Sequence, residues 1–241
     1  KEIRFFYVPD ATSRDEMPEE EAMHALRVLR LKSGDTMMIT DGCGNFYEAE
    51  ITLAATRRCL YKILRTMPQT KPWRGNIRLV VSPTKMMERM EWMVEKLTEI
   101  GVNRIIPLLC RRSERKEIKV ERLQKIAISA MKQSLKAVLP QIDEMTPIRN
   151  VIPQLRESQR FVAYCDDAVP RISLARSYQP HRDAAIMIGP EGDFSSKEIA
   201  AAVAEGWQPV TLGDNRLRTE TAAIVGCDTF HILDQAYETV K

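Results

Sequence analysis

Two glycine-containing segments near the C-terminus carry residue types that can surround a small ligand. The first reads IMIGPEGDFSSKE, with Gly189, Pro190, Glu191 and Gly192 between an apolar run and a polar stretch. Glycines around a proline let the main chain pass close to a ligand and present backbone donors and acceptors, which suits an adenine edge or a ribose. An ordinary strand-to-helix turn would produce the same pattern.

The second segment, VTLGDNRLRTETAAIVG, places arginines beside a predicted helix start. Leu212 and Gly213 end a strand, Arg216 and Arg218 follow, and residues 219–223 open an apolar helix. Two arginines at a helix N-terminus favour an anion such as an RNA phosphate. The alternative is a solvated arginine pair with an N-capping threonine. Neither segment matches G-x-x-x-x-G-K-[ST] or G-x-G-x-x-G, so ATP hydrolysis and NAD chemistry have little support.

Beyond residue 75, apolar runs alternate with helical patterns, which predicts an α/β fold with a largely parallel sheet covered on both faces. Ligands of open α/β sheets bind beyond the carboxyl ends of the strands, and both glycine segments follow a strand. A helix over 85–100 is predicted by an apolar stripe of core residues, and Gly101 ends it. That stripe is Met86, Met90, Met93, Leu97 and Ile100. Ser195 and Glu198 form a capping box for another helix, which Gly206 ends.

The first 67 residues read as short strands and turns with one helix between Pro18 and Gly34, which predicts a small β-barrel. The segment MPQTKPWRG (67–75) has the composition of an interdomain connection. We therefore expect two domains, 1–70 and 75–241.

Composition narrows the class of protein. The chain has 241 residues, 44% of them hydrophobic, 29% charged, and a net charge of +3, as in ordinary globular proteins. Its five cysteines are scattered and odd in number, so we expect reduced, buried thiols and neither disulfides nor a metal site. His181 and His231 lack ligand spacing and are interpreted as structural. No apolar stretch approaches bilayer length and the start is unlike a signal peptide, so we expect a cytoplasmic protein and no membrane partner.

Taken in order, these motifs resemble a known family. GPEG before a capped helix, followed by LGxxxLRTETA, resembles the RsmE ribosomal RNA methyltransferases of the SPOUT class. HALRVLRLKSGD (24–35) with DGCGNFYEAEI is similar to their PUA-like RNA-binding domain, and residues 82–113 to the start of their catalytic domain. The resemblance implies a deep C-terminal trefoil knot, a homodimer, and S-adenosyl-L-methionine as the methyl donor. The implied reaction methylates uridine ring nitrogen 3 in 16S small-subunit ribosomal RNA, either free or in the assembled 30S subunit.

Carried over by position, the resemblance also implies which residues line the cofactor pocket. They are Gly189, Pro190, Glu191, Gly192, Leu212, Gly213, Leu217, Arg218, Thr219, Glu220, Thr221 and Ala222. Two positions depart from the family pattern. The arginine before the Leu-Arg pair is shifted, giving Asn215 and Arg216. Where the family often has a Glu-Gln pair followed by Arg, this chain has MKQSLK, in which Gln133 matches and Lys132 and Lys136 depart.

Methyl transfer to a uracil ring nitrogen requires removal of a proton that uracil holds at neutral pH. Arg218 is the candidate for stabilising the uracil anion, and Glu220 for positioning or for accepting the proton. Candidate RNA contacts are Arg4, His24, Arg27, Arg30, Lys32, Lys85, Arg89, Arg111, Arg112 and Arg216. Two alternatives stay open: a non-catalytic RNA-binding factor for ribosome assembly, and a methyltransferase of RNA 2′-hydroxyls.

Overall fold

The computed structural model describes residues 5–165 and 170–238. The chain forms two compact units, one made of Lys1–Pro72 and Ile128–Leu139, the other of Trp73–Ala127 and Pro140–Lys241. Within the described ranges, no helix combines the length and the apolar composition that a bilayer crossing requires.

The first unit is built on a four-stranded sheet whose spatial order is the chain order. Its strands are β1 (Phe5–Tyr7), β2 (Thr36–Thr40), β3 (Asn45–Ala54) and β4 (Cys59–Pro68). β1 pairs with β2 in parallel, and the other two pairs are antiparallel. Phe6, Ile39 and Ile51 are fully buried in its core. The strand pairs of the described residues do not include a β1–β4 pair, which would close the sheet into a barrel.

The helical segment of this unit is shorter than the sequence predicts. α1 (Glu19–Met23) continues into a π-helical turn, η1 (His24–Val28). The predicted helix would have run to Gly34, but Arg30 adopts a φ of 56°, which a right-handed helix does not allow. The chain then turns, and the Lys32 backbone N–H donates to the Asp35 carboxylate at 2.7 Å.

The second unit is an eight-stranded sheet in which all pairs of the described strands are parallel. Its main path has the order β10-β12-β9-β11-β5-β6-β7, and β8 pairs with β6. The strands are β5 (Ile77–Val81), β6 (Arg104–Leu109), β7 (Gln141–Ile142), β8 (Thr146–Pro147), β9 (Gln159–Ala163), β10 (Ile172–Ser173), β11 (Ala184–Ile188) and β12 (Gln208–Thr211). The helices are α2 (Met87–Ile100), α4 (Ile148–Gln154), α5 (Leu174–Ser177), α6 (Ser196–Ala204) and α7 (Thr219–Ala236). α3 (Val120–Gln133) begins in this unit, and its residues from Ile128 onwards group with the first unit.

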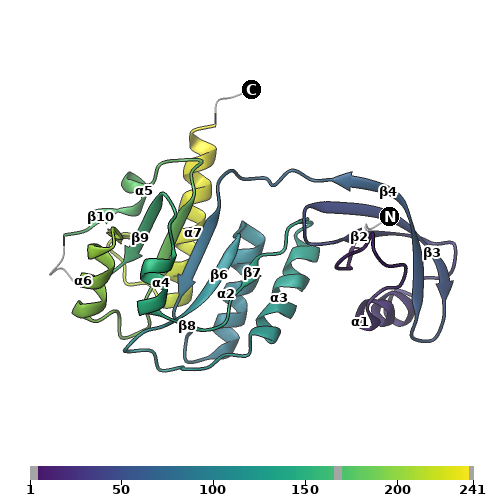
Figure 1. Ribbon diagram of the computed structural model, residues 1–241, viewed down its shortest axis with the longest axis horizontal. Helices are drawn as coiled ribbons and strands as arrows, with labels where there is room; N and C mark the ends of the chain where they lie inside the picture. The colour runs from purple at the N-terminus through teal and green to yellow at the C-terminus, as the bar shows by residue number, and fades with distance from the viewer. Residues whose placement is uncertain (1–4, 166–169, 239–241) are drawn as a thin grey trace. The chain divides into compact units, whose positions relative to one another are not determined.

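Helices cover both faces of this sheet, which confirms the predicted α/β class (Figure 1). α2, α5 and α7 form one layer, with α7 packed on β5 and β11, while α4 and α6 contact the sheet through β6 and β12. β11 is buried along its whole length, as expected for a central parallel strand with a neighbour on each side. Among the methionines of the predicted stripe, Met90 and Met93 are fully buried, but Met86 is 52% exposed because it precedes the helix as its N-cap.

The predicted helix ends are largely present. Gly101 ends α2 with a φ of 124°, and a Cβ there would lie 2.8 Å from the Trp73 ring. Ser195 and Glu198 form the predicted capping box of α6. Two of the cysteines expected to be buried, Cys43 and Cys165, are exposed.

Candidate active site

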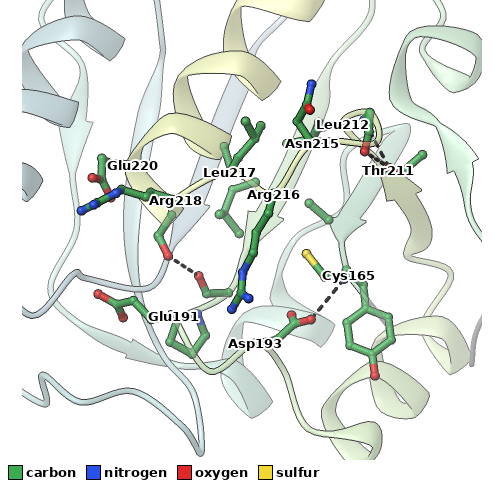
Figure 2. Close-up of a pocket in the computed structure, with 18 of the residues that line it drawn as sticks. Cys165, Glu191, Asp193, Thr211, Leu212, Asn215, Arg216, Leu217, Arg218 and Glu220 are labelled. Atoms are coloured by element: carbon green, nitrogen blue, oxygen red, sulfur yellow. Dashed lines mark hydrogen bonds between the residues drawn. The ribbon is translucent and has the colours of Figure 1, made fainter. Parts of the chain in front are cut away.

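A cavity of about 1350 Å³ opens at the carboxyl ends of three neighbouring parallel strands, β11, β9 and β12 (Figure 2). Because β9 lies between the other two strands, the loops that follow all three strands meet there. The wall consists of residues 163–165, 170–171, 188–193, 210–220 and 222, together with Lys85, Met86 and Arg89. Both glycine segments singled out in the sequence therefore line one cavity.

The loop after β11 is held by its own turn and by neighbouring segments. The Asp193 backbone N–H donates to the Pro190 carbonyl at 2.8 Å, and Asp193 itself adopts a φ of 60°. One Asp193 carboxylate oxygen accepts from the Cys165 backbone N–H at 3.1 Å, which joins this loop to the end of β9 (Figure 2). Glu191 accepts from the Lys85 backbone N–H at 3.2 Å. The loop enters the cavity in a fixed form before α6 begins.

A buried hydrogen bond joins the two predicted loops. The Thr219 hydroxyl donates to the Gly189 carbonyl at 3.1 Å. The alternative interpretation of this threonine as an N-cap is wrong, because Arg218 occupies the cap position and Thr219 lies in the first turn of α7. Upstream, Gly213 adopts a φ of 121°, and a Cβ there would meet no atom within 4 Å. The backbone at Gly213 therefore borders open space.

Charges in the cavity fall into paired and unpaired groups. Glu220 is 5% exposed and its carboxylate accepts from the Arg89 guanidinium at 2.6 Å. Arg216 and Arg218 are exposed residues, and neither forms an ion pair within the described parts of the chain. Arg89 is therefore already neutralised, whereas Arg218 can offer its charge to a ligand.

Cys165 lines the cavity as an exposed free thiol. Partial burial and the nearby Asp193 carboxylate raise the pKa of Cys165, and Arg171 and Arg216 oppose that rise only in part. The thiol is thus neutral at physiological pH and poorly suited to act as a nucleophile. Among the described residues, no group of three His, Cys, Asp or Glu side chains could hold a metal ion.

All but one of the residues predicted to surround the cofactor line this cavity. The exception is Thr221. Consecutive helical residues turn by about 100°, so the first turn of α7 cannot present every side chain to the same space. Of the predicted RNA contacts, Lys85, Arg89 and Arg216 belong to the cavity wall.

Arg111 and Arg112 lie outside the cavity wall. The Arg112 side chain instead donates to the Gly192 carbonyl at 2.8 Å. In the first unit, Arg27 and Lys32 line a shallow groove of about 640 Å³ together with Leu26, Leu31, Ser33 and residues 54–56.

The remaining predicted RNA contacts also belong to the first unit. His24 is exposed, and its ring edge packs on Phe6 with the ring centroids 5.9 Å apart. Arg30 is exposed in its positive-φ turn. Arg4 lies outside the described residues. His231 is structural, as interpreted: it is buried, with its ring nitrogen 2.7 Å from the Gly101 carbonyl.

The sequence pattern missed the third loop of the cavity. Ala163 is the last residue of β9, Tyr164 and Cys165 follow it, and Arg171 lies further along the same connection. The run RFVAYC predicted the strand correctly, but nothing in its composition indicates that β9 lies between β11 and β12.

Comparison with known proteins places the chain in a family. A family model described as an RNA methyltransferase domain matches residues 71–231, and one described as an RNA methyltransferase PUA domain matches residues 18–64. The chain belongs to the RNA methyltransferase family. The family model covers the whole cavity wall, and the resemblance stated from the sequence motifs is confirmed.

Individual proteins are similar to this RNA methyltransferase over nearly its full length. Ribosomal RNA small subunit methyltransferase E of Rickettsia conorii is 26% identical, covering 95% of this chain and 93% of the relative. A probable rRNA-methyltransferase from Porphyromonas gingivalis, known as a crystal structure, is 46% identical with a TM-score of 0.93, covering 98% and 100%. Ribosomal RNA small subunit methyltransferase E of Neisseria gonorrhoeae, solved with S-adenosyl methionine bound, is 28% identical with a TM-score of 0.85, covering 96% and 98%.

Proposed function

We propose that this chain transfers the methyl group of S-adenosylmethionine to ring nitrogen 3 of a uridine in small-subunit ribosomal RNA, in the cytoplasm. The observation that carries the proposal is the meeting of the loops after β11 and β12 in one cavity, joined by the Thr219–Gly189 hydrogen bond. The names of the curated relatives and the S-adenosyl methionine bound to the Neisseria protein support it.

The cavity fits a nucleoside-bearing methyl donor. Its volume of about 1350 Å³ exceeds the 300–1000 Å³ of common small-ligand pockets, which leaves room for a donor and a flipped base. Main-chain groups of residues 189–192 and 212–217 would hold the donor, because the backbone at Gly213 borders open space. When bound, S-adenosylmethionine supplies an electrophilic methyl group on a positively charged sulfur.

Arg218 has the properties needed to stabilise a uracil anion. It lies at the N-cap of α7, where the helix N-terminus adds partial positive charge, and it is free of ion pairs within the described residues. A cation placed beside the ring lowers the energy of the deprotonated nitrogen as the ring proton passes to solvent water. We assign Arg218 this electrostatic role in the reaction.

Glu220 is better suited to positioning than to accepting the proton. Its buried carboxylate already accepts a hydrogen bond from the Arg89 guanidinium at 2.6 Å, so this oxygen is engaged by a donor within the protein. We therefore assign Glu220 to holding Arg89 and the start of α7 in place at the cavity wall.

RNA would approach through cations at the cavity and on the first unit. Lys85 and Arg216 lie on the cavity wall, and Arg27 and Lys32 line the groove of the first unit. Such side chains position the phosphate backbone, and the base is selected inside the pocket. We further propose a homodimer that acts on the RNA of the assembled 30S subunit. Trp92 of α2 and Ile232 of α7 are exposed apolar side chains on two helices that pack together, and we propose them as contacts of this dimer.

Nucleoside mass spectrometry of small-subunit ribosomal RNA, with and without the gene, tests the proposed reaction. We expect 3-methyluridine to be absent from the small-subunit ribosomal RNA of cells that lack the gene. The intact gene should restore it. Loss of a 2′-O-methylated nucleoside instead would favour methylation of 2′-hydroxyls. An unchanged nucleoside profile, together with no heat on titration of the protein with S-adenosylmethionine, would favour the non-catalytic RNA-binding factor.

A further inference from the structure

The loop after β6, residues 110–115, contributes no residue to the cavity wall. It is nevertheless a hydrogen-bonded turn. The Ser113 backbone N–H donates to the Cys110 carbonyl at 3.2 Å, and the Ser113 hydroxyl accepts from the Cys110 backbone N–H at 2.9 Å. A buried hydrogen bond of 2.9 Å joins the Ser113 and Ser82 hydroxyls and so anchors the turn to the end of β5.

From this turn, Arg112 reaches one side of the cavity wall. Its guanidinium donates to the Gly192 carbonyl at 2.8 Å and to the Phe194 carbonyl at 3.3 Å. The arginine stem also packs closely on the glycine, since a Cβ at Gly192 would lie 3.4 Å from the Arg112 Cβ. Two carbonyls that flank the turn at Asp193 are therefore held by a single side chain.

Arg115 reaches a second, adjoining segment of the wall from the same loop. It donates to the Lys85 carbonyl at 2.6 Å and to the Thr84 carbonyl at 3.3 Å. The two wall segments are also joined directly, because the Lys85 backbone N–H donates to Glu191. One anchored loop therefore holds the main chain of two adjoining segments of the cavity wall.

We propose that Arg112 and Arg115 are positioning residues that hold the two wall segments, 84–86 and 189–194, in the form that binds the methyl donor. This inference rests on the proposed function. It reassigns Arg112, which the sequence suggested as an RNA contact, to a role that precedes RNA binding. Neither arginine belongs to the cavity wall, and each acts through the backbone carbonyls that accept its hydrogen bonds.

The loss of an arginine's charge alone would strengthen the binding of the methyl donor. S-adenosylmethionine carries a net positive charge from its sulfonium, ammonium and carboxylate groups, so removing a nearby arginine should favour its binding electrostatically. A weaker affinity after such a substitution therefore reports a lost hydrogen-bonded support of the wall.

Arg111 offers a matched control for this test. It is exposed like Arg112, and its backbone N–H donates to Glu198 at 2.8 Å, a contact that a side-chain substitution leaves in place. Its side chain makes no hydrogen bond or ion pair within the described parts of the chain. Arg111→Ala thus removes the same charge next to Arg112 without releasing a carbonyl of the wall.

The experiment measures S-adenosylmethionine affinity by titration calorimetry without RNA, with thermal melting as a check on folding. We expect Arg112→Ala to weaken binding about tenfold, equivalent to about 1.4 kcal/mol, and Arg111→Ala to change it less than about twofold. Arg112→Lys, which keeps a donor, should recover most of the loss. In turnover assays Arg112→Ala should raise KM for the donor and leave kcat at saturation within about twofold.

Arg115→Ala provides a second, independent variant, because it releases the adjoining segment at Thr84 and Lys85 and should weaken binding in the same way. Affinity unchanged by both Arg112→Ala and Arg115→Ala, or an equal loss in Arg111→Ala, would overturn the inference. A wild-type chain that binds no S-adenosylmethionine would overturn the proposed function and this inference with it.

Discussion

The Arg89–Glu220 pair allows a quantitative test of how the start of α7 is held at the cavity. The Glu220 side chain is 6% exposed and that of Arg89 is 38% exposed, with 2.6 Å between the guanidinium nitrogen and the carboxylate oxygen. Breaking a fully buried pair destabilises a protein by about 3–5 kcal/mol, mainly because a buried charge is left without a partner. Since Arg89 is partly solvated, we expect Arg89→Met to lower the free energy of unfolding by about 2 kcal/mol.

The coupling free energy between Arg89 and Glu220 distinguishes the loss of an ion pair from a simple loss of packing contacts. Once Glu220→Gln has removed the buried charge, Arg89→Met should destabilise the protein by about 1 kcal/mol instead of about 2 kcal/mol, which gives a coupling free energy of about 1 kcal/mol. Urea unfolding at pH 7 of the wild type, both single variants and the double variant measures it. The exposed pair Arg57–Glu19, at 3.7 Å with both side chains 69% exposed, is the control and should show no measurable coupling.

Activity measurements on the same variants separate the two roles suggested for Glu220. If it positions Arg89, Glu220→Gln keeps an acceptor for the guanidinium and should retain most of kcat. If it accepts the uracil proton, Glu220→Gln should abolish turnover while Arg89→Met should not. A coupling no larger than that of the control pair would refute the reasoning.

Three further predictions concern single residues. Arg218→Ala should abolish methylated product while S-adenosylmethionine affinity stays within about threefold in calorimetry, and full activity would end its electrostatic assignment. Burial disfavours the charged form of Asp41, but hydrogen bonds from Asn45, the Cys43 backbone and Tyr47 outweigh it and lower the Asp41 pKa. Asp41→Asn should therefore destabilise the protein by about 2 kcal/mol at pH 7. The difference in stability between wild type and variant should vanish as pH falls through the lowered pKa of Asp41. Melting curves measured against pH, with the exposed Asp15→Asn as control, check this. Because its pKa is raised, Cys165 should be alkylated at pH 8 more slowly than a model thiol, as followed by mass spectrometry, and equal rates would contradict the assigned environment.

The features that the sequence predicts well are those with a local physical cause. The continuous apolar run at β11 requires burial on both faces, and the Ser195–Glu198 capping box needs only residues three apart. The two glycine segments stand out in the sequence because glycine at a strand end leaves the backbone open to a ligand. Their meeting in one cavity follows from parallel strands having their carboxyl ends at one edge of the sheet.

The features that the sequence does not predict depend on strand order and on contacts between residues distant in sequence. The loop after β9 lines the cavity only because β9 lies between β11 and β12, an order that no local pattern reveals. Met86 fits the helical stripe but precedes the helix, and Arg112 looks like a surface cation until its carbonyl partners, 80 residues away or more, are known. The trefoil knot, which the family resemblance implies, stays a prediction.

The most direct test of the central claim is a crystal structure of this protein with S-adenosylhomocysteine, the demethylated form of the donor. We predict density for its adenine, ribose and sulfur between residues 189–192 and 212–217. Arg218 should lie beside the space next to the sulfur atom. A ligand bound elsewhere on the protein, with these two loops empty, would contradict the account.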